Sequence, residues 1–270
     1  MKTFIKQYEL KNQGIQKRIV LISDIHYYID TPNSYLLEIQ KKINDLNPSY
    51  ICIAGDIVDL TNVRDKMSVE PLYRFLKELG HISPVIMVLG NHDVKAAETT
   101  YYEDPILLDE LRSIPNVHLL RNKSIEFEDI YFMGYEPSFQ YYEIEGEKNR
   151  TLFLKEAKGK IKASKKYSVL LIHTPIHVLE DYYEPLHLEK FSLILSGHTH
   201  NGLVPSWIHG NRGLVSPIKT LFPKNIRGKM EKGNTTLIVT GGIMKLSYCS
   251  GFFHHFSNFF KGEITCIDLK

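Results

Sequence analysis

Short runs of apolar and often β-branched residues recur along the chain, and each run ends in polar residues. Runs of about four to eight such residues are typical of strands that are buried on both faces of a sheet. They predict strands at 18–23, 50–54, 84–89, 117–120, 125–127, 130–134, 168–172, 193–196, 235–240 and 263–269. The close spacing of 117–120, 125–127 and 130–134 predicts antiparallel pairing within that trio.

Between the early strands, apolar residues recur with a helical period. One predicted helix spans 33–47, is closed by Pro48, and collects on one face the apolar residues Leu36, Leu37, Ile39, Ile43 and Leu46. Further helices are predicted at 69–79, at 104–113 and in the lysine-rich stretch 152–163. Strands that alternate with helices predict a mixed α/β fold whose sheets are covered by helices.

Composition adds limits to this picture. The chain has 270 residues, of which 43% are hydrophobic and 24% charged, and it shows no repeat or linker, so one domain over 1–270 is expected. A net charge of +2 gives no reason to expect nucleic acid as an obligatory partner. Three cysteines without paired spacing indicate a reducing compartment. No signal-peptide run and no span of about 18 apolar residues is present, so a cytoplasmic location is expected.

Five of the predicted strands lead into residues that commonly bind metals. The motifs are Asp24-x-His26, Gly55-Asp56, Gly90-Asn91-His92-Asp93, His173 and Gly197-His198-x-His200. Two histidines two residues apart are, by themselves, equally consistent with a polar loop. Ligands collect at the carboxyl ends of strands in open α/β folds, however, and five such ends together favour a metal site.

In this order, the five motifs resemble the signature blocks of the calcineurin-like metallophosphoesterases, over about 19–269. The chain most resembles their bacterial single-domain, phosphodiesterase-like branch. The resemblance implies a four-layer α/β (α+β) sandwich of two mixed β-sheets flanked by helices, with a dinuclear metal site at the carboxyl ends of the strands. It also implies a ligand set for each metal: Asp24, His26 and His200 for one, Asn91, His173 and His198 for the other, and Asp56 as the bridge.

Such a ligand set suits two divalent ions, Mn, Fe or Zn, and the lack of thiolates disfavours a structural zinc cluster. Two metals about 3.5–4 Å apart lower the pKa of a shared water toward ~7. The expected reaction is in-line attack of a metal-bridging hydroxide on a phosphodiester or pyrophosphate-type bond. His92 is the predicted general acid and Asp93 its orienting partner. Asp59 either orients a ligand or caps a turn, and Gly55, Gly90 and Gly197 are expected to allow close turns.

Other interpretations stay open. The same site would serve a phosphomonoesterase or a nuclease, whereas a non-catalytic binding scaffold would require lost ligands. The expected partner is a phosphorylated small molecule or nucleotide-type substrate. The basic stretch 207–232 either grips a second phosphate or is a solvated loop. The aromatic stretch 251–260 either closes the core, lines a substrate groove, or makes weak membrane-surface contact through Phe252–Phe260. Tyr141, Tyr142 and 182–183 are candidates for the rim of the site.

Overall fold

The computed structural model describes residues 3–11, 14–27, 31–58, 66–93, 95–97, 100–102, 105–144, 146–175, 182–203, 213, 226–243 and 261–270. Asp59, Cys249, the aromatic stretch 251–260 and most of 207–225 lie outside these residues, and so do the hypotheses that concern them.

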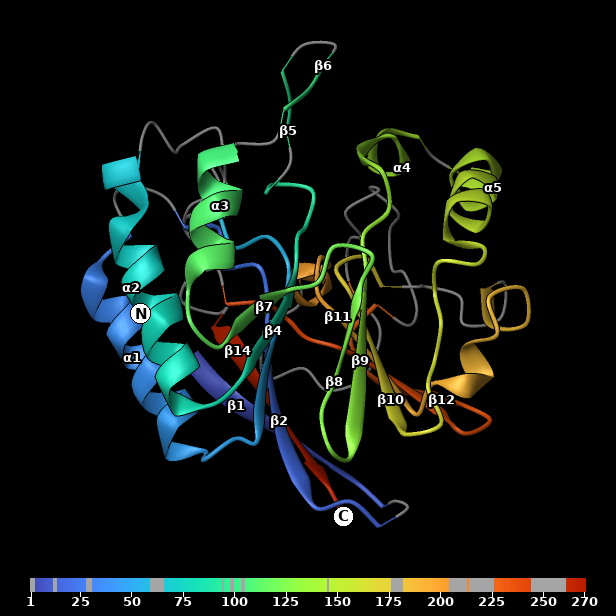
Figure 1. Ribbon diagram of the computed structural model, residues 1–270, viewed down its shortest axis with the longest axis horizontal. Coiled ribbons are helices and arrows are strands. Elements are labelled where there is room, and N and C mark those ends of the chain that lie inside the picture. The colour runs from blue at the N-terminus through green and yellow to red at the C-terminus, as the bar shows by residue number, and fades with distance from the viewer. Residues whose placement is uncertain are drawn as a thin grey trace.

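The first of two six-stranded sheets carries both the N-terminal and the C-terminal strand (Figure 1). Its strand order is β1 (Thr3–Leu10), β14 (Gly262–Leu269), β2 (Lys17–Ile22), β3 (Tyr50–Ala54), β4 (Val85–Val88) and β7 (Val117–Leu119). Neighbouring strands are parallel except β14 and β2, which are antiparallel. The sheet is therefore mixed, and β2, β3 and β4 end at the same edge.

The second sheet has the order β12 (Gly228–Lys232), β13 (Thr235–Val239), β11 (Leu193–Ser196), β10 (Tyr167–Ile172), β9 (Ile130–Tyr135) and β8 (Ser124–Glu126). The four central strands are parallel, and the two outermost strands run antiparallel to them. A separate hairpin of β5 (Lys95–Ala97) and β6 (Thr100–Tyr102) projects from one end of the molecule (Figure 1).

Helices cover the outer faces of the sheets (Figure 1). On the first sheet lie α1 (Asn33–Asp45), α2 (Lys66–Ile82) and α3 (Pro105–Ser113), and on the second lie α4 (Phe139–Glu143) and α5 (Gly146–Ala157). Two short 3-10 turns, η1 (Leu188–Lys190) and η2 (His200–Leu203), flank β11. The layers are thus helices, sheet, sheet and helices, which confirms the predicted four-layer sandwich.

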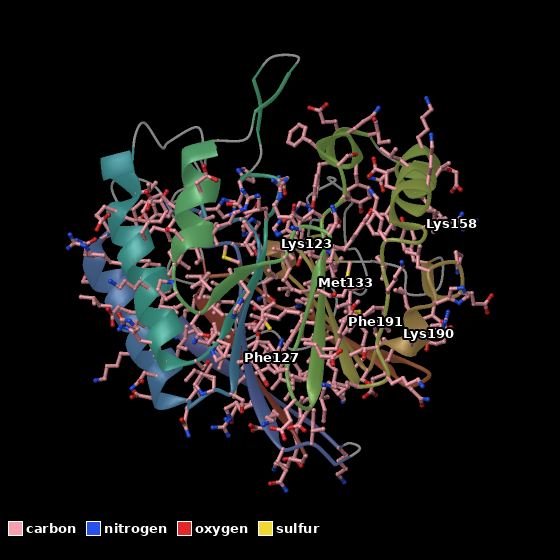
Figure 2. The ribbon with its side chains drawn as sticks, in the orientation of Figure 1. Lys123, Phe127, Met133, Lys158, Lys190 and Phe191 are labelled. Atoms are coloured by element: carbon pink, nitrogen blue, oxygen red, sulfur yellow. The ribbon has the colours of Figure 1, made fainter. Side chains whose placement is uncertain are left out.

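Three apolar clusters fill the spaces between these layers. In β2, Val20 and Ile22 pack with the helices, whereas Ile19 and Leu21 pack between the sheets. Both faces are buried, which explains why this strand reads as a continuous apolar run. Figure 2 shows Phe127 between the two sheets, while Lys158 at the other side of the second sheet points into solvent.

Several sequence predictions were wrong in detail. The helix predicted at 152–163 is α5, which begins at Gly146 and ends at Ala157, because the lysine-rich continuation turns at Gly159 with a φ of +77°. Only β8 and β9 of the predicted trio pair antiparallel, since β7 joins β4 in the other sheet. The edge strands β1 and β12 were not predicted.

Among the described residues, the helices are all too short or too polar to cross a bilayer.

Candidate metal centre

The five motifs meet because the strand pairing continues past the ends of the strands. The Asp24 N–H donates to the carbonyl of Gly55 (3.0 Å), and the His26 N–H donates to that of Asp56 (2.9 Å). In the second sheet, the Gly197 N–H donates to the carbonyl of His173 (3.0 Å). Loops that stay paired in this way carry their side chains to one edge of both sheets.

Contacts between the sheets bring these loops together. The His198 N–H, which follows β11, donates to Oδ2 of Asp24, which follows β2, at 3.0 Å. Nδ1 of His173, which follows β10, lies 2.7 Å from the carbonyl oxygen of Ala54 in β3. Each sheet therefore orients residues that belong to the other.

A first cluster consists of Asp24, His26 and His200, whose candidate ligand atoms all lie within 4.8 Å of one another. Oδ1 of Asp24 lies 3.9 Å from Nε2 of His26 and 3.7 Å from Nε2 of His200. Asp24 and His26 are buried, and His200 is partly exposed. The cluster is open to solvent on the side of His200.

A second cluster consists of Asp56, His173 and His198, which satisfy the same distance limit. Nε2 of His173 lies 3.2 Å from Oδ2 of Asp56, 3.0 Å from Nδ1 of His198 and 3.1 Å from Oδ1 of Asn91. Asn91 thus belongs to this cluster through its amide oxygen.

Asp56 connects the two clusters. Its Oδ2 lies 3.5 Å from Nε2 of His26 and 3.2 Å from Nε2 of His173. Its Oδ1 accepts the backbone N–H of His92 at 2.8 Å, and the His92 ring lies edge-on to His26 with centroids 4.6 Å apart. The structure therefore gathers the seven predicted metal ligands and His92 in one place, with the two histidines of the last motif in different clusters. Their assignment as ligands stays a prediction.

The hydrogen bonding of His173 indicates what this site is built to hold. The Ala54 carbonyl can only accept, so Nδ1 of His173 carries the proton and Nε2 presents a lone pair when the ring is neutral. That lone pair faces a carboxylate oxygen and an amide oxygen, both of which are acceptors as well. Three acceptors in contact need a cation among them. A proton or a metal ion fits this place, and the donor set suits a borderline divalent metal.

The first cluster shows the same need. Oδ1 of Asp24 and Nε2 of His26 are buried and have no hydrogen-bond partner among the described residues. Buried polar atoms are almost always satisfied, so these two call for a ligand of opposite character. Burial lowers the pKa of His26 to about 4, against the raising effect of Asp56. His26 is therefore neutral at pH 7, the form that binds metals.

In the second cluster, the interaction between opposite charges outweighs burial in setting the pKa values. Burial by itself would raise the pKa of Asp56, but the charge of His173 and its hydrogen bond outweigh this effect and hold the pKa well below its usual range. Burial likewise would lower the pKa of His173, and Asp56 outweighs it and raises the pKa. In the metal-free protein a proton on His173 thus occupies the position that a metal would take.

The backbone of the site is strained. Five of the seven predicted ligands have positive φ angles: Asp24 (52°), His26 (43°), Asp56 (50°), His198 (70°) and His200 (45°). Left-handed backbone costs a non-glycine residue roughly 1–2 kcal/mol. Such strain persists only where the surroundings hold it, and it gathers at functional sites. The hydrogen bonds that continue the strand pairing into these loops provide that restraint, and they direct the side chains inward.

Asp93 has a structural environment of its own. Its carboxylate is buried and accepts the backbone N–H groups of Val58 (2.9 Å) and Gly90 (2.8 Å), which fastens the turn after β3 to the turn after β4. Burial, followed by the charge of Asp56, raises its pKa. Its role as the partner of His92 stays a prediction.

Three further residues support the site, and two of them were not singled out in the sequence. The Ser23 hydroxyl donates to Oδ2 of Asp24, and Oε1 of Glu136 accepts the Leu89 N–H at 2.9 Å, just before the Asn91 motif. The Tyr142 ring, a candidate for the rim, lies 5.6 Å from that of His198. Ser23 adjoins a motif and could have been noticed there, whereas Glu136 reaches the site only through contact between the sheets.

Comparison with known proteins settles the family. Residues 17–202 match the family model described as calcineurin-like phosphoesterase. The chain belongs to this family. The matched region begins with β2 and ends just after His200, so it contains all five motifs, and the prediction from their order is confirmed.

The relatives are distant and longer. An uncharacterized metallophosphoesterase of Campylobacter jejuni is 30% identical over 73% of this chain and 47% of its own length. A transmembrane protein with a metallophosphoesterase domain from Danio rerio is 29% identical over 68% of this chain and 40% of its own. LpxG of Chlamydia muridarum, a UDP-2,3-diacylglucosamine pyrophosphatase, is 25% identical over 68% of this chain and 63% of its own. The chain spans about half the length of these relatives.

Similar solved structures include a dimetal phosphatase from Danio rerio, 15% identical, with a TM-score of 0.46 over 84% of this chain and 87% of that one. A purple acid phosphatase from yellow lupin is also 15% identical, with a TM-score of 0.47 over 85% of this chain and 44% of that one.

Proposed function

We propose that this protein is a dinuclear metal-dependent phosphoesterase that hydrolyses a phosphodiester or pyrophosphate-type bond. The observation that carries the proposal is the position of Asp56, whose Oδ2 lies 3.5 Å from His26 in one cluster and 3.2 Å from His173 in the other. A single carboxylate between two imidazole clusters is the arrangement that holds two cations close together.

The proposed ligands follow the two clusters. Asp24, His26 and His200 would hold one ion, and Asn91, His173 and His198 would hold the other. Asp56 would be shared by both. Two divalent cations, when bound, supply Lewis acidity toward water and toward the phosphoryl oxygens. The chain itself supplies a fixed tautomer at His173, a neutral His26 and a backbone that is already strained into the binding conformation.

His92 is the proposed general acid. Its backbone N–H is anchored on Oδ1 of Asp56, and its ring lies against His26 at the first cluster. A ring at this edge of the first cluster could donate a proton to the leaving oxygen of a phosphate bound at the metals. Asp93 ties this turn, through Gly90, to the turn after β3, through Val58, which supports a positioning role for its carboxylate.

The substrate bond is proposed from the relatives. Two of them are named UDP-2,3-diacylglucosamine pyrophosphatase, one 25% identical over 227 residues and one 37% identical over 76 residues. This favours a pyrophosphate or diester bond over a monoester. The substrate itself does not carry over at such identities.

The variant Asp56→Asn tests the proposal. Removing the shared negative charge should release both metals and abolish hydrolysis across a panel of monoester, diester and nucleotide-pyrophosphate substrates. Elemental analysis of the purified proteins measures the metals, and Asp109→Asn on the exposed surface of α3 is the matched control. Asp56→Asn with two metals and full activity would refute the bridge. A wild-type protein that holds two metals but cleaves no member of the panel would leave a binding scaffold instead.

A further inference from the structure

A pocket of about 300 Å³ lies directly beside the metal centre. Leu89 and Gly90, which precede Asn91 in the chain, form one side of it, and Tyr142 of α4 forms another. The Tyr142 ring also lies 5.6 Å from His198 and 6.3 Å from His173. Because the same residues border the pocket and the second cluster, a molecule whose phosphate lies at the metals can extend into this pocket.

Hydrogen bonds hold the walls of the pocket in place. Glu136, at the end of β9, accepts the Leu89 N–H at 2.9 Å with Oε1 and receives Nε of Arg121 at 2.9 Å on Oε2. The Ser138 N–H donates to Oε2 of Glu156 in α5 at 3.0 Å. The first two contacts join the turn after β4 to the end of β9. The third joins α5 to the start of α4, and both helices follow β9 in the chain (Figure 1). The pocket is therefore preformed, as binding sites for small molecules usually are.

The charges that line the pocket balance. Two carboxylates, Glu136 and Glu156, face two cations, Arg121 and Lys160. Arg121 is paired with Glu136, so its charge is already compensated. A subsite for a second phosphate would carry an excess of positive charge. This lining, in contrast, has no net charge and offers both hydrogen-bond donors and hydrogen-bond acceptors. It therefore suits a neutral polar group.

The size of the pocket sets the size of that group. A volume of about 300 Å³ lies at the lower end of the range found for small-molecule pockets, which suits a single ring better than a larger ligand. A hexose ring or a nucleobase has about this size and carries the hydroxyl or amide groups that the lining would bind.

We propose that this pocket binds a neutral ring bearing hydroxyl or amide groups, attached to the phosphate that is cleaved. The assignment rests on the proposed function, and it narrows the substrate class to phosphoesters of a sugar or a nucleoside. Tyr142 stands between the ring and the metal centre and shapes the passage from one to the other.

The test uses p-nitrophenyl phosphodiesters that share one leaving group and differ in the second ester group: methyl, hexosyl or nucleosidyl. We expect kcat/KM for a ring-bearing ester to exceed that of the methyl ester at least tenfold, mainly through KM. The hexosyl and nucleosidyl arms identify which ring is bound. Equal values for all three esters would overturn the pocket assignment while leaving the proposed function standing. Cleavage neither of these esters nor of a nucleotide pyrophosphate would count against the proposed function itself.

Ser138→Trp fills the pocket at a position whose side chain makes no capping hydrogen bond to α4. It should lower the ring-to-methyl ratio of kcat/KM at least tenfold, and bound metal per chain shows whether the variant is folded. Ser113→Trp, exposed at the end of α3, is the matched control and should keep the ratio. If Ser138→Trp does not fold, Lys160→Ala on the exposed rim should lower the ratio severalfold. A ring preference that survives pocket filling would refute the neutral-ring assignment.

Discussion

Gly90→Ala should weaken metal binding without removing any ligand. A Cβ atom at Gly90 would overlap Oδ1 of Asp56 and would lie 2.6 Å from the Asp56 backbone nitrogen and 2.8 Å from its Cγ. Real Cβ atoms essentially never come within 3.0 Å of such neighbours, so one side has to move. The Asp56 backbone is fixed by the hydrogen bond from His26, and its carboxylate by the hydrogen bond from His92.

The magnitude follows from these contacts. Relief at the backbone nitrogen requires a shift of a few tenths of an ångström, and the carboxylate has to move further still. Overpacking of this kind costs about 1–3 kcal/mol of stability. Loss of the contacts that support a metal ligand typically costs 10–100-fold in affinity, and because Asp56 is the proposed ligand of both ions, both affinities should fall by at least this factor.

Calorimetric titration of the metal-free protein with Mn²⁺ measures the affinities, and thermal unfolding in chelator measures stability. Gly159→Ala is the matched control. Its φ of +77° makes alanine cost about 1–2 kcal/mol, yet a Cβ there meets no atom within 4 Å, and the residue lies outside both clusters. The two variants should lose similar stability, while only Gly90→Ala should lose metal affinity. The reasoning would be refuted if Gly90→Ala bound Mn²⁺ with wild-type affinity, or if both variants lost the same metal affinity.

Two further substitutions test other parts of the site. His92→Ala should keep both metals but slow hydrolysis about 10²–10⁴-fold for esters with poor leaving groups, and less for p-nitrophenyl esters, because only poor leaving groups need a proton; equal losses would contradict the general-acid role. Arg227 is 3% exposed, its Nη1 donates to Oδ1 of Asn201 beside His200 at 3.3 Å, and its charge interacts with the buried Glu263. Arg227→Met should lower the free energy of unfolding by about 1–3 kcal/mol in urea titrations because the hydrogen bond to Asn201 is lost, whereas Arg74→Met in an exposed ion pair should cost less than about 1 kcal/mol. Similar small losses in both would show that Arg227 makes no net contribution.

The basic stretch that contains Arg227 illustrates what sequence patterns leave open. Its charges suggested either a phosphate grip or a solvated loop. In the part that the structure describes, Arg227 is buried and residues 228–232 form β12, with Lys229 paired to Glu231 at 2.7 Å. The sequence does not show whether a charged side chain such as Arg227 faces solvent, because its burial depends on which elements pack against it in the fold.

The sequence by itself determined the central strands and the family. The central strands are buried on both faces, so each appears in the sequence as a continuous apolar run that can be recognised without knowing its neighbours. These strands are β2, β3, β4, β10 and β11. The ligand-type residues follow these strands directly, so their identities and order were visible as well. The edge strands β1 and β12 gave no comparable signal. In β1 the exposure alternates, but apolar and polar residues do not follow it, since Ile5 is exposed and Lys6 is only partly exposed.

Only the tertiary structure decided how the motif residues work together. The resemblance already implied that His198 and His200 serve different metals, but the positive φ angles that turn their side chains into separate clusters are seen only in the structure. The tautomer of His173 depends on the carbonyl of Ala54, 119 residues away in the chain and in the other sheet. The neutral pocket beside Gly90 depends on Glu136 and on the helices that cover the second sheet. Sequence determines which side chains leave the strands, and the packing of the two sheets determines which atoms those side chains meet.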